Sequence, residues 1–232
     1  MTTLYRNFLN VGALTTGSRI LGFVRDALVA AVLGTGFAAD AYLAAFRFPN
    51  LFRRLFAEGA FNTAFIPLFA KSIEQDGMEA AREWAGRIIS WLVAVVLVVT
   101  VLAEIFMPWV LAPFVPGFLD DPAKYDLTVL LTRICFPYLM CMSLMAAYAA
   151  ILNGLGRFIA ASFAPILLNI VMIAFMAPLV LYPNTDVETA IWIAIGTIAG
   201  GIAQLALVYL AIRRAGFVPR LGWPRFSAEV QR

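Results

Sequence analysis

The chain has 232 residues, of which 62% are hydrophobic and 13% are charged, and its formal net charge is +3. A soluble domain carries roughly 45–50% apolar and 25% charged residues, so this composition excludes an ordinary water-soluble fold, and the small net charge gives no reason to expect a nucleic-acid partner. The apolar stretches run for about 20 residues without a two-residue alternation, which predicts membrane-spanning helices and argues against a transmembrane barrel.

The predicted fold class is therefore all-α, a polytopic membrane protein with six transmembrane helices. The spans cover residues 8–33, 38–70, 84–111, 125–152, 158–181 and 188–212, and residues 213–232 form a basic linker on the cytoplasmic side. Gly34–Gly36 and Asn153–Arg157 mark turns between spans, because glycine and asparagine favour turn conformations. Gly196, Gly200 and Gly201 form a face of small residues, which predicts close approach of a neighbouring helix.

The basic residues outside the spans are unevenly distributed, and this asymmetry predicts the orientation of the chain. With the N-terminus inside, the cytoplasmic side holds Arg6, Lys71, Arg82, Arg87, Arg157, Arg213, Arg214, Arg220 and Arg225. The opposite side holds one basic residue among acidic ones, namely Lys124 beside Asp120, Asp121, Asp126, Asp186 and Glu188. We therefore expect both termini on the cytoplasmic side.

A cluster of charged residues interrupts the first two spans. Its members are Arg19, Arg25, Asp26, Asp40, Arg47, Arg53, Arg54 and Glu58. An ionised residue at the bilayer centre costs about 2.5–3.5 kcal/mol on insertion scales, so these residues are expected to face a watery cavity, one another or a ligand. Arginines outnumber carboxylates in the cluster. One guanidinium group can donate two parallel hydrogen bonds to two oxygens of a phosphate. The cluster therefore indicates an anionic, phosphorylated ligand.

A structural interpretation accounts for part of this cluster. Asp40, Arg47 and Arg54 recur every seven residues, so they share one helix stripe, and we expect Arg47 to pair with Asp40. Arg54 is expected to pair with Glu58, four residues later. If the second span is short, Arg53 and Arg54 instead reach the inner surface. With those pairs set aside, the arginines with charge to spare are Arg19, Arg25 and Arg53.

A second charged pair is predicted between the third and fourth spans. Glu104 and Arg133 lie at similar depth in these spans. We expect a buried ion pair that fixes helix packing and has no role in ligand binding.

Several motifs carry a resemblance to a known family. They are SRILGFVRD at 18–26, FPNL at 48–51, the arginine pair at 53–54, FAEGA at 56–60, LNGLGRF at 152–158 and FAPILLNI at 163–170. Together they closely resemble the MurJ/MviN family of lipid II flippases, within the multidrug/oligosaccharidyl-lipid/polysaccharide exporter superfamily. The resemblance covers essentially the whole chain.

The resemblance implies a function. It implies that lipid II, the undecaprenyl-diphosphate-linked peptidoglycan precursor, moves from the inner to the outer leaflet of the bacterial inner membrane by alternating access between two six-helix lobes. By the same resemblance, Arg19, Arg25 and Arg53 bind the diphosphate and sugar head group. The resemblance assigns gating or cavity polarity to a further set: Ser18, Asp26, Asp40, Asn50, Arg54 and Glu58.

The chain is much shorter than the members of this family, so we expect it to be the N-terminal lobe alone. The partners then expected are lipid II, the lipid bilayer and a second lobe supplied in cis or in trans. Two lobes are needed to rock against each other around a central site, so we expect no flippase activity from this lobe alone.

Three other functions remain possible on the sequence alone. A related exporter of other lipid-linked glycans or of drugs is one alternative, although a cavity for cationic drugs would need surplus acid rather than surplus arginine. A non-transporting scaffold of a cell-wall complex is another. An enzyme acting on a lipid phosphate is disfavoured, because the sequence has no histidine and no close acidic motif to activate a nucleophile or hold a metal. We expect no cofactor and no metal.

Overall fold

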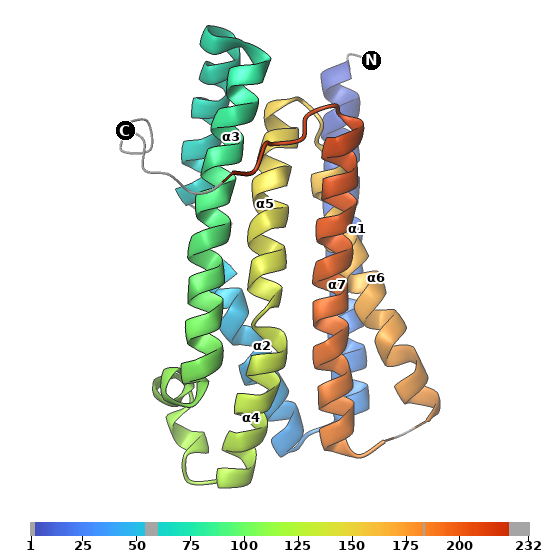
Figure 1. Ribbon diagram of the computed structural model, residues 1–232. Coiled ribbons are helices and arrows are strands. Elements are labelled where there is room, and N and C mark those ends of the chain that lie inside the picture. Colours follow the sequence, from blue (N-terminus) through green and yellow to red (C-terminus); the bar gives the residue numbers. More distant parts are fainter. Residues whose placement is uncertain (1–2, 54–59, 183, 223–232) are drawn as a thin grey trace.

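The computed structural model describes residues 3–53, 60–182 and 184–222 (Figure 1). Over these residues the chain is built from helices and contains no strand: α1 (Thr3–Leu33), α2 (Phe37–Arg53), α3 (Ala60–Leu111), α4 (Pro122–Cys135), α5 (Tyr138–Gly154), α6 (Ile159–Leu181) and α7 (Asp186–Arg214), with the short 3-10 turns η2 (Ala112–Phe114) and η3 (Pro116–Phe118). The predicted all-α fold class is confirmed.

Helix α3 contains a sharp turn at Gly77, which lies between the second and third predicted spans. Gly77 has φ 83° and ψ 174°, a backbone conformation that glycine adopts without steric cost. The chain is helical on both sides of Gly77, so α3 is two helices that meet at this residue (Figure 1). The second predicted span therefore corresponds to α2 and the first part of α3, and its residues 54–59 lie outside the described residues.

The fourth predicted span is divided into α4 and α5. Phe136 and Pro137 separate the two helices, and the amide of Phe136 still donates to the carbonyl of Thr132 at 2.8 Å. Proline has no amide hydrogen and its ring crowds the preceding turn, which accounts for the break at this point. The fifth and sixth predicted spans agree with α6 and α7 to within two residues at each end.

Four helical stretches of the described chain are long and apolar enough to cross a membrane. They are Ala64–Phe114, Pro122–Gly154, Ile159–Leu181 and Asp186–Arg214. Helices α1 and α2, which carry the described part of the charged cluster, are not among these four. Helix α2 has only 17 residues. Helix α1 has 31 residues, but polar and charged side chains interrupt its apolar stretches.

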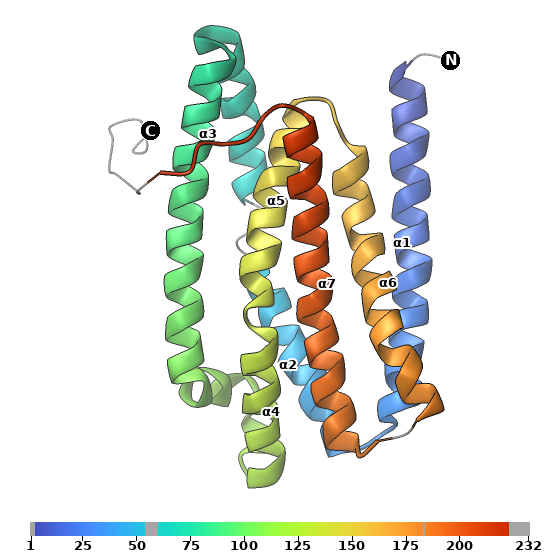
Figure 2. The same ribbon diagram turned by 45° about the vertical axis from the view of Figure 1, so that its right-hand side comes forward.

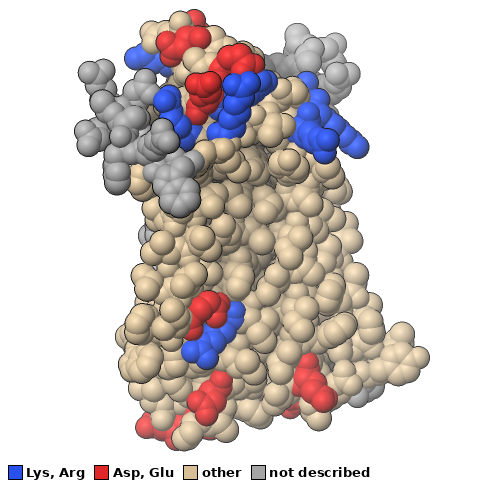
Figure 3. Space-filling view, viewed as in Figure 1, with Lys and Arg blue, Asp and Glu red and all other residues tan. Residues whose placement is uncertain are grey.

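On the face of the bundle seen in Figure 3, most charged side chains lie at the two ends. Figure 3 shows a wide uncharged band between these ends, interrupted by one small cluster of basic and acidic atoms. In the membrane-spanning part, Arg133 Nε donates to the backbone oxygen of Glu104 at 3.0 Å. The predicted buried ion pair between these two residues is wrong: Arg133 is exposed and bonds to the Glu104 backbone, not to its carboxylate. Glu104 Oε1 is buried and has no hydrogen-bond partner among the described residues.

The small-residue face of α7 packs closely against its neighbours, as the sequence predicted. A Cβ atom added at Gly196 would lie 2.9 Å from Phe175 Cβ, one at Gly200 would lie 2.5 Å from Leu168 Cδ1, and one at Gly201 would lie 2.5 Å from Tyr138 Cδ2. These separations are shorter than an ordinary carbon–carbon contact, so the absence of a Cβ atom at these positions allows α7 to pack this closely on α5 and α6.

The residues that follow α7 cross from the end of that helix to α3 (Figure 2). Arg82 Nη2 donates to the carbonyl of Gly216 at 2.7 Å, and the amide of Gly222 donates to Ser90 Oγ at 3.1 Å. Phe217 is buried. The first part of the predicted linker, residues 215–222, is therefore docked on α3, and residues 223–232 lie outside the described residues.

The docking of residues 215–222 requires glycine at position 86. A Cβ at Gly86 would lie 2.1 Å from the carbonyl oxygen of Arg220, so Gly86→Ala is expected to detach this segment from α3. Trypsin should then cleave after Arg220 several-fold faster than in the unsubstituted protein, because a detached backbone fits a protease site. Gly12→Ala is the matched control, since a Cβ there meets nothing within 4 Å. Equal cleavage rates for Gly86→Ala and Gly12→Ala would contradict the prediction.

Candidate functional site

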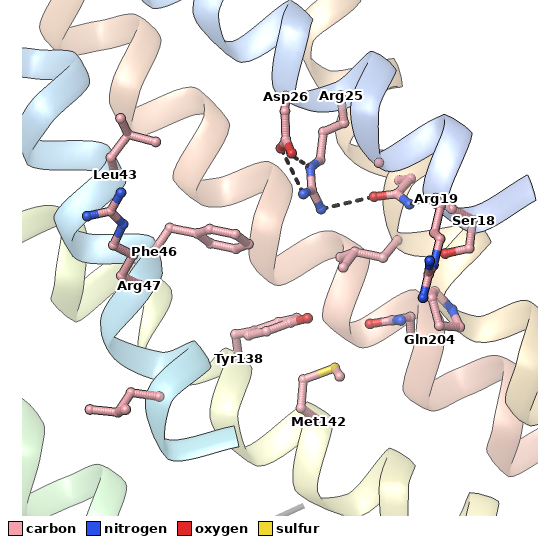
Figure 4. Close-up of a pocket in the computed structure, with 15 residues that line it drawn as sticks. Ser18, Arg19, Arg25, Asp26, Leu43, Phe46, Arg47, Tyr138, Met142 and Gln204 are labelled. Atoms are coloured by element: carbon pink, nitrogen blue, oxygen red, sulfur yellow. Dashed lines mark hydrogen bonds and ion pairs between the residues drawn. The ribbon is translucent and has the colours of Figure 1, made fainter. Parts of the chain in front are cut away.

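A cavity of about 690 Å³ lies among α1, α2, α5, α6 and α7 (Figure 4). It is lined by fifteen residues, of which the charged ones are Arg19, Arg25, Asp26 and Arg47. We call it the arginine cavity. Three guanidinium groups face one carboxylate, which leaves a surplus of two positive charges.

Arg25 is held at the cavity wall by side chains of two helices. Its Nε and Nη2 donate to Asp26 Oδ1 at 3.0 and 2.8 Å, and its Nη1 donates to Asn169 Oδ1 of α6 at 2.9 Å. The Arg25 guanidinium carbon also lies 5.8 Å from the centroid of the Phe46 ring of α2. Asn169 Nδ2 in turn donates to the backbone oxygen of Ser18 at 3.0 Å. These bonds tie α1 to α6 and fix the direction of the Arg25 side chain.

Arg19 and Arg47 differ from Arg25 because their guanidinium groups are uncommitted. Both side chains are exposed, and neither forms a hydrogen bond or ion pair with any other residue that the structure describes. Figure 4 shows them toward opposite sides of the arginine cavity, with Arg19 on α1 and Arg47 on α2. An anion entering the cavity could therefore be bound from two sides without first breaking a salt bridge to either residue.

Asp40 lies outside the arginine cavity and lines a second cavity of about 670 Å³, between α2 and the η2–η3 segment. Its Oδ2 accepts from Lys124 Nζ of α4 at 2.6 Å, and the same Nζ lies 4.2 Å from the centroid of the Phe118 ring. The predicted Arg47–Asp40 pair is wrong. Seven residues separate the two Cα atoms by about 10.5 Å along a helix, whereas the start of α4 lies directly beside Asp40.

Several predicted site residues have side chains outside the part of the protein that the structure describes. They are Asn50, Arg53, Arg54 and Glu58. The Arg54–Glu58 pair and the phosphate-binding role of Arg53 therefore stay predictions. Of the other predicted residues, the structure brings Ser18, Arg19, Arg25 and Asp26 together in the arginine cavity.

Three cavity residues have roles that the sequence analysis missed. Arg47 was assigned to an internal pair, and Asn169 and Gln204 were not considered individually. Asn169 is 4% exposed and Gln204 is 1% exposed, yet both line the cavity. A polar amide inside an otherwise apolar span is a signal that could have found both of them, because such residues usually face a cavity or a neighbouring helix. Within the described residues no group of histidine, cysteine or acidic side chains is arranged to hold a metal ion.

The Asn169 side chain is expected to contribute to stability as well as to the site. Asn169→Leu would leave Arg25 Nη1 and the backbone oxygen of Ser18 without their partners, and an unpaired buried polar group costs about 1–3 kcal/mol. The free energy of unfolding in mixed micelles should fall by that amount. Thr100→Val is the control, because the Thr100 hydroxyl is buried but has no partner to lose. An unchanged free energy of unfolding for Asn169→Leu would contradict the structure of this wall.

The family model and the curated relatives that match this chain all carry the same family name. The family model described as lipid II flippase MurJ matches residues 29–232. The chain is 48% identical over 234 residues to a probable lipid II flippase MurJ of Rhizobium tropici, covering 99% of this chain and 43% of that protein. It is 35% identical over 225 residues to the lipid II flippase MurJ of Burkholderia cenocepacia, covering 94% of this chain and 42% of that protein.

A solved structure of a protein with the same family name has a similar fold. The chain superimposes on lipid II flippase MurJ in an inward closed conformation with a TM-score of 0.72 and 25% sequence identity. The match covers 92% of this chain and 43% of that structure. The chain thus spans less than half the length of the relatives it matches.

Proposed function

The chain belongs to the lipid II flippase MurJ family, and we propose that it forms the N-terminal lobe of a flippase for lipid-linked peptidoglycan precursor. The relatives and the apolar helices make it a multi-pass bacterial membrane protein. The observation that carries the proposal is the arginine cavity, because its surplus of two positive charges and its uncommitted Arg19 and Arg47 suit a diphosphate.

The diphosphate would be bound both by an arginine without a bonded partner and by Arg25, which is held by Asp26 and Asn169. Arg19 approaches from α1, and Arg25 is already oriented by Asn169. Asp26 Oδ1 now accepts both bonds from Arg25 Nε and Nη2, and a phosphate could accept from the same two donors with two of its oxygens. We propose that the ligand takes the place of Asp26 at that guanidinium, while Arg53 contributes as the resemblance implies. Arg47 was not assigned to the ligand from the sequence, and its place in the cavity lining supports adding it.

Transport would follow by alternating access between this lobe and a second one. Asp40 and Lys124 hold α2 to α4 at one end of the bundle, so opening at that end would break or loosen this ion pair. We propose gating or cavity polarity for Ser18, Asp26, Asp40, Asn50, Arg54 and Glu58. No covalent step is needed, and the chain would act as a transporter rather than as an enzyme.

We propose that the basic end of the bundle faces the cytoplasm, with both chain termini on that side. The rule that cytoplasmic segments carry more arginine and lysine supports this orientation. In Figure 1, α1 begins and α7 ends at the same end of the bundle. Arg213 and Arg214 close α7, and Arg157 lies between α5 and α6. Asp120, Asp121, Asp186 and Glu188 lie at the opposite end, toward the outer leaflet.

The binding role is tested with undecaprenyl diphosphate and purified protein. Arg19→Gln and Arg47→Gln should each weaken binding about tenfold or more, because hydrogen bonds to charged groups contribute about 1.5–3 kcal/mol. Arg133→Gln removes a membrane-embedded arginine that does not line the cavity, and it should leave the affinity unchanged. Equal affinities for all these variants, or tighter binding of a quaternary ammonium drug than of the diphosphate, would favour a related exporter instead.

The need for a second lobe is tested by transport rather than binding. A polypeptide limited to residues 1–232, reconstituted in liposomes, should bind lipid II without moving it to the other leaflet, since one lobe has nothing to rock against. Addition of the second lobe of a relative should restore movement. Movement of lipid II by residues 1–232 alone, measured by access of an external enzyme to the head group, would overturn the two-lobe proposal.

A further inference from the structure

Gln204 is a buried amide at the wall of the arginine cavity. It lies on α7, is 1% exposed and lines the cavity together with Ser18, Arg19 and Asn169. Its Oε1 atom is buried and accepts no hydrogen bond from any described residue. Figure 4 shows Gln204 toward the Arg19 side of the cavity, with Arg47 toward the opposite side.

A purely structural role does not account for this side chain. Thr197, two turns earlier on α7, is equally buried, but its Oγ1 donates to the carbonyl of Ile193 at 3.1 Å and lies 3.5 Å from the Tyr42 hydroxyl. The Gln204 oxygen has no corresponding bond within the described residues. Four other side chains of the described residues also have a buried atom without a partner, namely Arg82, Thr100, Glu104 and Ser143, and none of these four lines the arginine cavity. Among the described residues, Gln204 therefore has a buried atom without a hydrogen-bond partner and also lines the arginine cavity.

The packing of α7 explains why Gln204 is held at the cavity. Gly200 and Gly201 bring α7 against Leu168 and Tyr138, and both of those residues also line the cavity. Gln204 lies one turn beyond Gly200, so the close helix contact places its amide at the cavity wall and leaves it little freedom to turn toward solvent. A buried carbonyl oxygen in this position is satisfied when a ligand or a water molecule supplies a donor.

Only certain groups of a ligand could donate a hydrogen bond to Gln204 Oε1. Oε1 can only accept a hydrogen bond, and the phosphate oxygens of a diphosphate diester also only accept at neutral pH. The amide oxygen therefore cannot bind the diphosphate that the arginines would hold. It can accept from a hydroxyl or an amide N–H group.

We propose that Gln204 is a specificity-determining residue that binds a hydroxyl or amide N–H group of the saccharide next to the diphosphate. This inference rests on the proposed function. The arginines supply affinity for the charge that lipid-linked diphosphates share, and Gln204 distinguishes carriers that bear a saccharide from carriers that do not.

The test compares two probes on the purified protein in nanodiscs: undecaprenyl diphosphate, and the same lipid diphosphate carrying the disaccharide pentapeptide. Gln204→Met keeps the length of the side chain and removes its polar group. It should weaken binding of the saccharide-linked probe about fivefold, the effect of one lost hydrogen bond, and leave binding of the bare diphosphate unchanged. Ser143→Ala is the matched control, because it removes a buried unpartnered hydroxyl outside the cavity, and it should change neither affinity.

Each outcome bears on the inference. Equal affinities of the unsubstituted and Gln204→Met proteins for the saccharide-linked probe would overturn it, and so would an equal loss for both probes, which would mean that Gln204 only shapes the cavity. Failure of the unsubstituted protein to bind either probe would instead reject the proposed function itself. Because the Gln204 oxygen has no partner to lose, Gln204→Met should keep the thermal unfolding midpoint. Gln204→Leu gives the same comparison if the methionine variant does not fold.

Discussion

Arg25 donates to Asp26 and to Asn169, and this arrangement determines how the charged part of α1 can exist inside a membrane. A lone guanidinium group in hydrocarbon is costly, whereas one bonded to a carboxylate and an amide is largely compensated. The bonds also tie α1 to α6 through the backbone of Ser18, so the same contacts that stabilise the charge build the cavity wall. Arg19 and Arg47 have no such compensation among the described residues, and they need water or an anion around them.

The rest of the bundle serves to keep that cavity open and shaped. The glycines of α7 let it pack directly on Leu168 and Tyr138, two lining residues, so the close contact of small residues forms one wall. Phe46 of α2 faces the Arg25 guanidinium and bounds the space from the other side. A cavity of about 690 Å³ in so apolar a chain persists because its walls are fixed by close helix packing on one side and by hydrogen bonds on the other.

Composition and the charge pattern predicted the all-α fold, the apolar helices that became α6 and α7, and a cavity at Arg19, Arg25 and Asp26. These features follow from local hydrophobicity and from the cost of charge in lipid. Ser18 was named only through the family resemblance. The ion-pair partner of each charged side chain could not be predicted from the sequence, because it depends on which helices lie next to one another. Asp40 was assigned to Arg47 on its own helix, yet its partner is Lys124, which is distant in sequence. Asn169 and Gln204 were missed for the same reason: their roles exist only where α6 and α7 meet α1.

Helix α2 lines both cavities, and this has a consequence for the proposed transport cycle. Leu43, Arg47 and Leu51 border the arginine cavity and also the cavity that contains Asp40. A displacement of α2 toward either space narrows it and widens the other, because one helix forms the shared wall. Alternating access requires this opposed behaviour of two openings. The Asp40–Lys124 pair holds α2 against α4 in the present arrangement, so the ion pair opposes movement of that wall until a ligand or the second lobe changes the balance.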